Sequence, residues 1–303
     1  MALFLTAISF LIVDGRIIRP GIDEKYSLQQ SILSGTNETR LQYGVLAPAV
    51  SFAIQKMAGT IVMNNQKLRL YSFELMSLFL FGAFFLLLYL YLRTSFPEVI
   101  SITGLVIAQV LLAIIIQDVC TEQAIFNLVF FVMGMLLFSI RKDFLLPLVI
   151  ALGGLNQPQI LALLLFYILL LFAEDRLLNF KSAAVILLSI GVWLFESSLL
   201  KSVYGLRNEP AVTENAQVNV PVYIALMLIL FLAAFAGSGK SVKFRRYSLL
   251  FIPLYFVFTM LVMPDASAAD LSPSIVLMLP AFLSMFESSG NEATVAENHR
   301  GTS

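Results

Sequence analysis

The chain has 303 residues, of which 59% are hydrophobic and only 13% are charged, and its mean hydropathy is +0.89. This composition is too apolar for a soluble globule with a charged surface, so the sequence predicts a polytopic membrane protein. The 19 basic and 19 acidic residues give no net formal charge, which argues against a nucleic-acid partner.

The contents of cysteine and histidine exclude several kinds of catalytic and metal site. Cys120 is the single cysteine, which rules out an intrachain disulfide and a thiolate metal cluster. The single histidine, His299, lies in the polar C-terminal tail, so neither a serine–histidine nucleophile nor a histidine-ligated zinc site is expected. Acid and base chemistry therefore falls to Asp, Glu, Tyr or Lys. The sequence indicates no cofactor, and a bound divalent cation is kept as an alternative.

Residues 2–13 are apolar but correspond to only about 18 Å of helix, against a hydrocarbon core of roughly 30 Å. The segment has neither the basic region nor the small-residue cleavage site of a signal peptide. We expect it to be part of a first membrane helix.

The interval 14–70 that follows is the longest polar stretch before the C-terminal tail. Within it, residues 26–35 and 45–57 place apolar side chains at helical spacing, with polar side chains between them. This pattern predicts two short helices that lie along the membrane surface.

The same interval contains Asp14 and the adjacent pair Asp23 and Glu24. A carboxylate held close to the bilayer can act as a general base or help to hold a metal ion. Acidic residues also favour the first turn of a helix, and a helix is expected to start near Tyr26, so a purely structural role is the alternative.

Further apolar segments predict, with the first, about ten spans in an all-α transmembrane bundle. They lie at residues 71–92, 99–117, 124–140, 144–155, 158–173, 182–200, 221–236, 247–262 and 273–287. The stretch 153–158 holds two glycines and a proline between two short segments, which predicts a break in the helix with Asn156 and Gln157 at a polar corner. We take residues 1–287 as one transmembrane domain and residues 288–303 as a polar tail.

The distribution of Lys and Arg predicts the orientation of the chain. With a cytoplasmic N-terminus, the basic residues of the short outer loops are Lys201 and Arg207 alone. Those of the inner loops are Arg93, Arg141, Lys142, Arg176, Lys181, Lys240, Lys243, Arg245 and Arg246. This asymmetry places the interval 14–70 and Asp118 on the extracytoplasmic side, and a plasma (inner) membrane is the expected location.

Other acidic residues lie at or inside the predicted spans. Glu74 and Glu196 lie within spans, where an unpaired carboxylate is expensive and therefore indicates a functional site. Asp118 and Glu122 flank the third and fourth spans on the outer side, where solvation is the alternative explanation.

Candidates for binding a phosphate or another part of a substrate are outer-side cations and the polar residues of the helix break. They are Arg16, Arg19, Lys201, Arg207, Asn156 and Gln157. A guanidinium offers two parallel donors to a phosphate, whereas contact with anionic lipid headgroups is the alternative role for these cations.

Several short patterns follow one another in the same order as these elements. They are Asp23-Glu24-x-Tyr26, Ile32-Leu33-x-Gly35, Leu46-x-Pro48, Asp118 between two spans, the break at residues 153–159, and a late outer loop at residues 265–280. Together they resemble the C-type glycosyltransferase superfamily, integral membrane enzymes that move a sugar from a polyprenyl-phosphate carrier to an acceptor on the outer face.

The resemblance implies that Asp23 takes the proton of the acceptor hydroxyl and that Asp118 orients the acceptor or a metal ion. The carrier phosphate would be held by cations among those named above, and the acceptor would be a glycan, a lipid or a protein. Gly44, Asn156 and Gln157 are neutral where the family often has charged residues. A non-catalytic subunit of the same architecture, or a transporter, is therefore kept as the alternative.

Overall fold

A computed structural model describes most of the N-terminal two thirds of the chain and short pieces near its C-terminus. The described residues are 1–37, 44–59, 65–115, 121–174, 179–204, 252–255, 257, 272–280 and 282–284. They form helices and turns, and no strand occurs among them, which confirms the all-α class. Three of the helices are long and apolar enough to cross a membrane, at Asn65–Arg93, Glu122–Ser139 and Phe180–Tyr204.

The described part of the chain contains the following helices and turns in sequence order. Their bounds are α1 (Ala2–Val13), the π-helical turn η1 (Asp14–Ile18), α2 (Ile22–Leu33), α3 (Leu46–Ala58), α4 (Asn65–Arg93), α5 (Glu98–Ile115), α6 (Thr121–Ser139), the 3-10 turn η3 (Asp143–Leu145), α7 (Leu146–Gly154), the 3-10 turn η4 (Pro158–Ile160), α8 (Leu161–Ala173) and α9 (Phe180–Tyr204).

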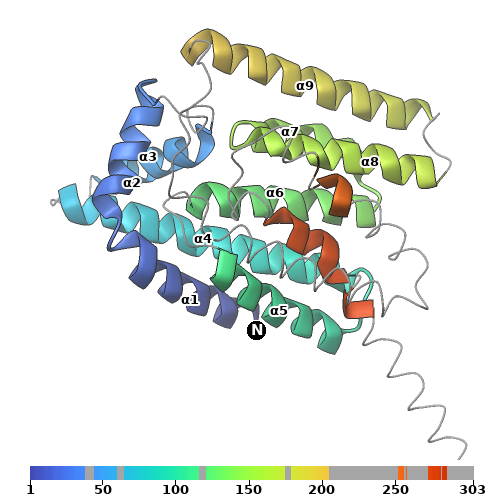
Figure 1. The fold of residues 1–303 in the computed structure, drawn as a ribbon, viewed down its shortest axis with the longest axis horizontal. Coiled ribbons are helices and arrows are strands. Elements are labelled where there is room, and N and C mark those ends of the chain that lie inside the picture. The colour runs from blue at the N-terminus through green and yellow to red at the C-terminus, as the bar shows by residue number, and fades with distance from the viewer. Residues whose placement is uncertain are drawn as a thin grey trace, which may run out of the picture.

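The long helices are arranged in layers, as Figure 1 shows. Helices α4 and α6 lie side by side in the middle, with α1 and α5 on one side and α7 and α8 on the other. Helix α9 forms the outermost layer against α7 and α8. The short helices α2 and α3 lie at one end of the bundle, beside one end of α4.

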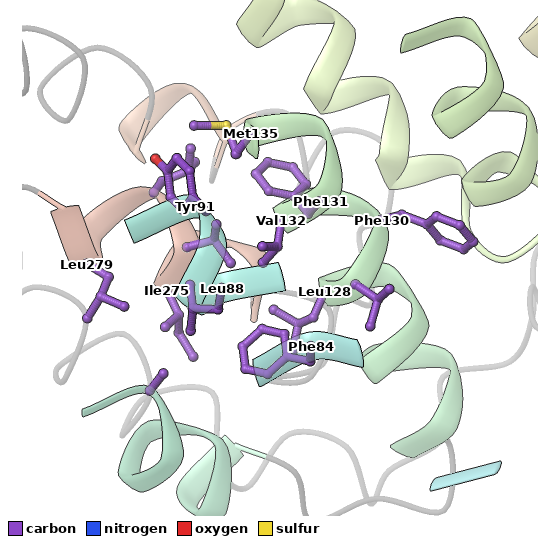
Figure 2. Close-up of a cluster of buried hydrophobic side chains, with 14 of the residues drawn as sticks. Phe84, Leu88, Tyr91, Leu128, Phe130, Phe131, Val132, Met135, Ile275 and Leu279 are labelled. Atoms are coloured by element: carbon purple, nitrogen blue, oxygen red, sulfur yellow. The ribbon is translucent and has the colours of Figure 1, made fainter. Parts of the chain in front are cut away.

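The contact between α4 and α6 forms the centre of the apolar core. Figure 2 shows Phe84 and Leu88 of α4 close to Leu128 and Val132 of α6, with Ile275 of a C-terminal helical piece beside them. All five side chains are at most 1% exposed. Close packing of this kind is the main source of helix association in a bilayer, because lipid tails are as apolar as the side chains they replace.

The two short helices predicted in the polar interval are confirmed as α2 and α3. Both ends of the interval 14–70 are helical in the structure. The chain stays helical through Ile18, where the Arg19 side chain donates a hydrogen bond at 2.7 Å to Asp14 Oδ2, and α4 begins at Asn65. Residues 65–70 are thus the polar first turns of α4, and the apolar part of this helix follows them.

The predicted break between the two short apolar segments is also confirmed. Gln157 has φ −156° and ψ 139°, the extended conformation that a following proline imposes, so the helix cannot continue through it. Helix α7 therefore ends at Gly154, and α8 starts anew after η4. The predicted span at 221–236 and most of the one at 247–262 lie outside the described residues.

Candidate functional site

Buried polar side chains gather at the end of the bundle where α2 and α3 lie (Figure 1). We call this region the α2–α3 end; it comprises α2, α3, the adjoining part of α4, the first turn of α6 and the break between α7 and η4. The backbone N–H of Leu46 donates to the carbonyl oxygen of Leu155 at 3.0 Å, which joins α3 directly to the break.

A buried ion pair between Lys25 of α2 and Glu122 of α6 lies at the centre of this end. The Lys25 Nζ lies 2.8 Å from Oε1 and 2.6 Å from Oε2 of Glu122, and the two residues are only 3% and 5% exposed. Ser77 of α4 donates to Oε1 at 3.5 Å, and the ring centroid of Phe73 lies 5.8 Å from Nζ. Both charges are thus removed from water, and the two charges compensate each other.

Lys25 points inward because of its position on α2. It shares one face of the helix with Gln29 and Ile32, four and seven residues further on, and all three are buried. The Gln29 amide donates to the carbonyl oxygen of Pro48 at 3.2 Å and accepts from Gln55 of α3 at 3.1 Å. These contacts fix the rotation of α2 and direct the ammonium toward α6.

A small cavity lies beside the ion pair. Its volume is about 30 Å³, and its walls come from α2, α3, α4 and α6. The polar walls are Lys25, Gln29, Glu122 and Gln123. The other walls are apolar, among them Phe73 and Met76 of α4, so the cavity is mixed in character and has room for about one water molecule beside the charged pair.

The helix break closes this region from the side of α7. Asn156 is fully buried, and its Nδ2 donates to the carbonyl oxygen of Gln123 at 2.8 Å. Gln123 Nε2 in turn donates to the carbonyl oxygen of Gly44 at 3.1 Å. Gln123 of α6 therefore joins the segment before α3, at Gly44, to the helix break at Asn156 through hydrogen bonds.

Gly44 occupies a place where no side chain fits. A Cβ atom there would lie 2.8 Å from the carbonyl oxygen of Asn156 and 2.9 Å from Nε2 of Gln123. This close approach gives a physical reason for glycine where the resemblance led us to expect a basic residue.

We expect Gly44→Ala to lower the free energy of unfolding by about 1–3 kcal/mol, because the added methyl group overpacks a contact made by backbone. Thermal unfolding of the purified protein in detergent measures the change. Gly191→Ala is the matched control, since a Cβ at this position in α9 meets nothing within 4 Å. Equal stability of the two variants would contradict the close approach at Gly44.

Glu196 of α9 lies against Gly154, the last residue of α7 before the break. The residue is 8% exposed, and a Cβ added to Gly154 would collide with its Oε2. The carboxylate predicted to lie within a span is therefore buried against the end of α7, at the backbone of the break.

Asp14 and Glu74, two other acidic candidates, share Arg19. The Arg19 side chain donates from Nε to Asp14 Oδ2 at 2.7 Å and from NH2 to Glu74 Oε1 at 2.9 Å. The hydrogen bond and charge of Asp14, with the charge of Glu74, raise the pKa of the Arg19 guanidinium above its ordinary value. Arg19 thus ties η1 to α4.

The structure leaves the remaining candidates apart from the cavity. Asp23 and Glu24 are exposed in the first turn of α2, and Asp23 lies two positions, about 200° of helix rotation, from Lys25. Arg16 and Lys201 are exposed as well. Gln157 is buried next to Asn156 at the break. Asp118 and Arg207 lie outside the described residues.

Sequence reasoning missed Lys25 and Gln123 as members of a site. The helical spacing that Lys25 shares with Leu28, Gln29 and Ile32 was a signal for an inward-facing lysine. Glu122 was considered as a boundary residue, but its partner is 97 positions away in the chain, and nothing local indicates that contact.

Comparisons of the chain with protein-family models, with curated proteins and with solved structures gave no match. Three of its described helices are long and apolar enough to cross a membrane, and two short helices cover a buried lysine–glutamate pair and a small cavity.

Proposed function

We propose that this protein is a glycosyltransferase of the C-type architecture in the plasma membrane, with about ten spans. It would transfer a sugar from a polyprenyl-phosphate carrier to an acceptor glycan, lipid or protein on the extracytoplasmic face. The observation that carries the proposal is the arrangement of α2 and α3, which follow the first helix and pack on each other at one end of the bundle, where the start of α3 is bonded to the break between α7 and α8. This is the order of parts that the resemblance leads us to expect.

In the proposed reaction, the acceptor oxygen forms a bond to the anomeric carbon while the bond from that carbon to the carrier phosphate oxygen breaks. The leaving group is the polyprenyl phosphate, which keeps the electron pair. Asp23 would take the proton of the acceptor hydroxyl, and its exposure in the first turn of α2 leaves the carboxylate accessible to an acceptor from water. Arg16 and Lys201 are exposed cations that can meet a phosphate at the surface.

The test is transfer of a radiolabelled sugar by the purified full-length protein in nanodiscs. Polyprenyl phosphates loaded with different hexoses and pentoses are the donors, and membrane lipids and envelope glycans are the acceptors. Label should move from the carrier to an acceptor with at least one donor. Failure with every donor would contradict the proposal.

A second candidate is a non-catalytic membrane subunit of the same architecture. The buried ion pair of Lys25 and Glu122 favours it, because these two charges bind each other inside the bundle. Gly44 and Asn156 favour it too. Both residues are neutral, the backbone of Asn156 packs closely against Gly44, and the Asn156 amide is bonded to the backbone of Gln123. Such a subunit should co-purify in a fixed ratio with a larger membrane transferase, and variants of the exposed carboxylates should not alter the activity of that complex.

The proposed orientation places the connection between α2 and α3 outside and the basic stretch around Lys240 in the cytoplasm. In a variant without Cys120, a cysteine at position 36 should react with a membrane-impermeant maleimide in intact cells. A cysteine at position 240 should react only after permeabilisation. The reverse pattern would overturn the orientation, and with it an extracytoplasmic site.

A further inference from the structure

Glu196 of α9 carries a buried carboxylate oxygen that has no hydrogen-bond partner among the described residues. The residue is 8% exposed, and this oxygen, Oε2, lies against Gly154 at the end of α7. The nearest basic residue along α9, Lys201, is exposed and projects about 140° away around the helix. A bare carboxylate inside a membrane bundle is expensive, so its charge must be compensated.

The backbone that Glu196 meets is itself rich in acceptors. In a continuous helix, the carbonyl of Gly154 would accept from the residue four positions on, but this residue is Pro158, which has no N–H. The N–H of Asn156 donates to the carbonyl of Gly153 at 3.0 Å rather than to that of Leu152. Two carbonyl oxygens at the end of α7 therefore lack the hydrogen bond that a continuous helix would give them.

Amide side chains add further acceptors to the break. Asn156 Oδ1 and Gln123 Oε1 are buried without a hydrogen-bond partner in the described part of the chain. The amide nitrogens of both residues are already used, since they donate to the carbonyls of Gln123 and Gly44. The C-terminal end of α7 also carries the negative end of the helix dipole. Such an excess of oxygen acceptors in a buried place favours a cation.

We propose that the Glu196 carboxylate and the freed backbone carbonyls at the end of α7 bind one sodium ion. The ion ties α9, the outermost layer of the bundle, to the helix break (Figure 1). Broken membrane helices are suited to this role, because unwound carbonyls and the C-terminal ends of half-helices can coordinate Na⁺. The inference goes beyond the proposed function and does not depend on it.

The chemistry of the ligands selects the ion. Carboxylate and carbonyl oxygens are the ligands of hard cations. One carboxylate balances one positive charge, whereas a divalent ion would leave a net charge buried. The carboxylate lies so close to the backbone that a Cβ on Gly154 would collide with it, and a site this narrow suits Na⁺ better than the larger K⁺.

Binding is measured with radioactive sodium by scintillation proximity, on the purified full-length protein in nanodiscs. We expect saturable binding of about one ion per chain. Thermal unfolding in detergent gives a second reading, with NaCl replaced by choline chloride at constant ionic strength. The Tm should rise by about 3 °C or more at a Na⁺ concentration one hundred times the dissociation constant. Equal concentrations of KCl should raise it less.

Glu196→Gln keeps the shape of the side chain but removes its charge. The affinity for Na⁺ should fall by about tenfold or more, and the Tm should no longer respond to Na⁺. The variant is expected to fold, because it has no bare charge to bury. Glu98→Gln is the matched control, since Glu98 is exposed in the first turn of α5, and it should keep the full response.

Gly154→Ala tests the geometry without changing a charge. The added methyl group would meet Oε2 of Glu196 and push the carboxylate away from the break, so the affinity for Na⁺ should again fall by about tenfold. Gly191→Ala adds the same methyl group to α9, where it meets nothing within 4 Å, and should bind Na⁺ as the wild type does.

A Tm of the wild type that is the same in NaCl and in choline chloride, with no bound sodium, would overturn the site. That result is also the one expected if a proton, rather than an ion, neutralises Glu196. Equal stabilisation by KCl would overturn the choice of ion. A full response to Na⁺ in Glu196→Gln would place the ion elsewhere and refute the role of this carboxylate.

Discussion

Replacement of Asp23 by Asn is expected to lower the rate of sugar transfer by about 10²- to 10⁴-fold, the usual contribution of a positioned general base. The amide has nearly the same shape as the carboxylate but cannot take the acceptor proton. Because Asp23 is exposed in the first turn of α2, the protein should stay folded and inserted. The measurement is the initial rate of transfer from a radiolabelled polyprenyl-phosphate sugar in nanodiscs.

Glu24→Gln is the matched control for Asp23→Asn. Glu24 is the adjacent acidic residue, is also exposed in the first turn of α2, and loses the same charge. Its substitution should reduce transfer by much less, since the resemblance assigns the proton transfer to Asp23. Equal rates for Asp23→Asn and the wild type would refute the catalytic assignment. Equal losses at both positions would point to the charge of this helix turn rather than to a base.

The second large effect is expected on stability, at the buried pair. Either single substitution, Lys25→Met or Glu122→Leu, should lower the free energy of unfolding by about 3–5 kcal/mol, because it removes one half of a buried ion pair. The double variant should recover most of this loss, since apolar side chains of similar volume avoid the desolvation of both ions. Thermal or denaturant unfolding in one detergent, followed by circular dichroism, compares the four proteins.

Lys56→Met gives the control for removing a lysine as such. Lys56 is exposed in the last turn of α3, so its loss should change the free energy of unfolding by no more than about 0.5 kcal/mol. A double variant at Lys25 and Glu122 as unstable as the singles would contradict the mutual compensation of the two charges. A Lys25→Met variant as stable as Lys56→Met would show that Lys25 is not buried in the folded protein.

The local elements of this fold could be predicted from the sequence because they depend on neighbouring residues. The helical spacing of apolar residues predicted α2 and α3, and the glycines and proline at 153–158 predicted the break. The ends of the polar interval could not be read in this way. Asp14 looked like the first residue of a loop, but its contact with Arg19 belongs to a turn that continues α1.

The centre of the candidate site could not be predicted, because it depends on contacts between distant parts of the chain. Lys25 and Glu122 are 97 positions apart, and Asn156 and Gln123 are 33 apart. A single sequence shows which residues share a face of a helix, but it does not show which faces pack against each other. The attention given to Asp23 and Glu24 followed their motif, whereas the side chain that points into the bundle is the lysine directly after them.

The hydrogen bonds between α3 and the break also constrain how this end of the molecule can move. Leu46 binds the carbonyl of Leu155, and Gln123 connects Gly44 with Asn156. Helix α3 therefore cannot move alone, because displacing its N-terminal end would break its hydrogen bond to the turn between α7 and η4. Widening the cavity would be a concerted motion of both parts, of the kind that occurs in microseconds to milliseconds. Relaxation-dispersion measurements on both segments should then yield one shared exchange rate.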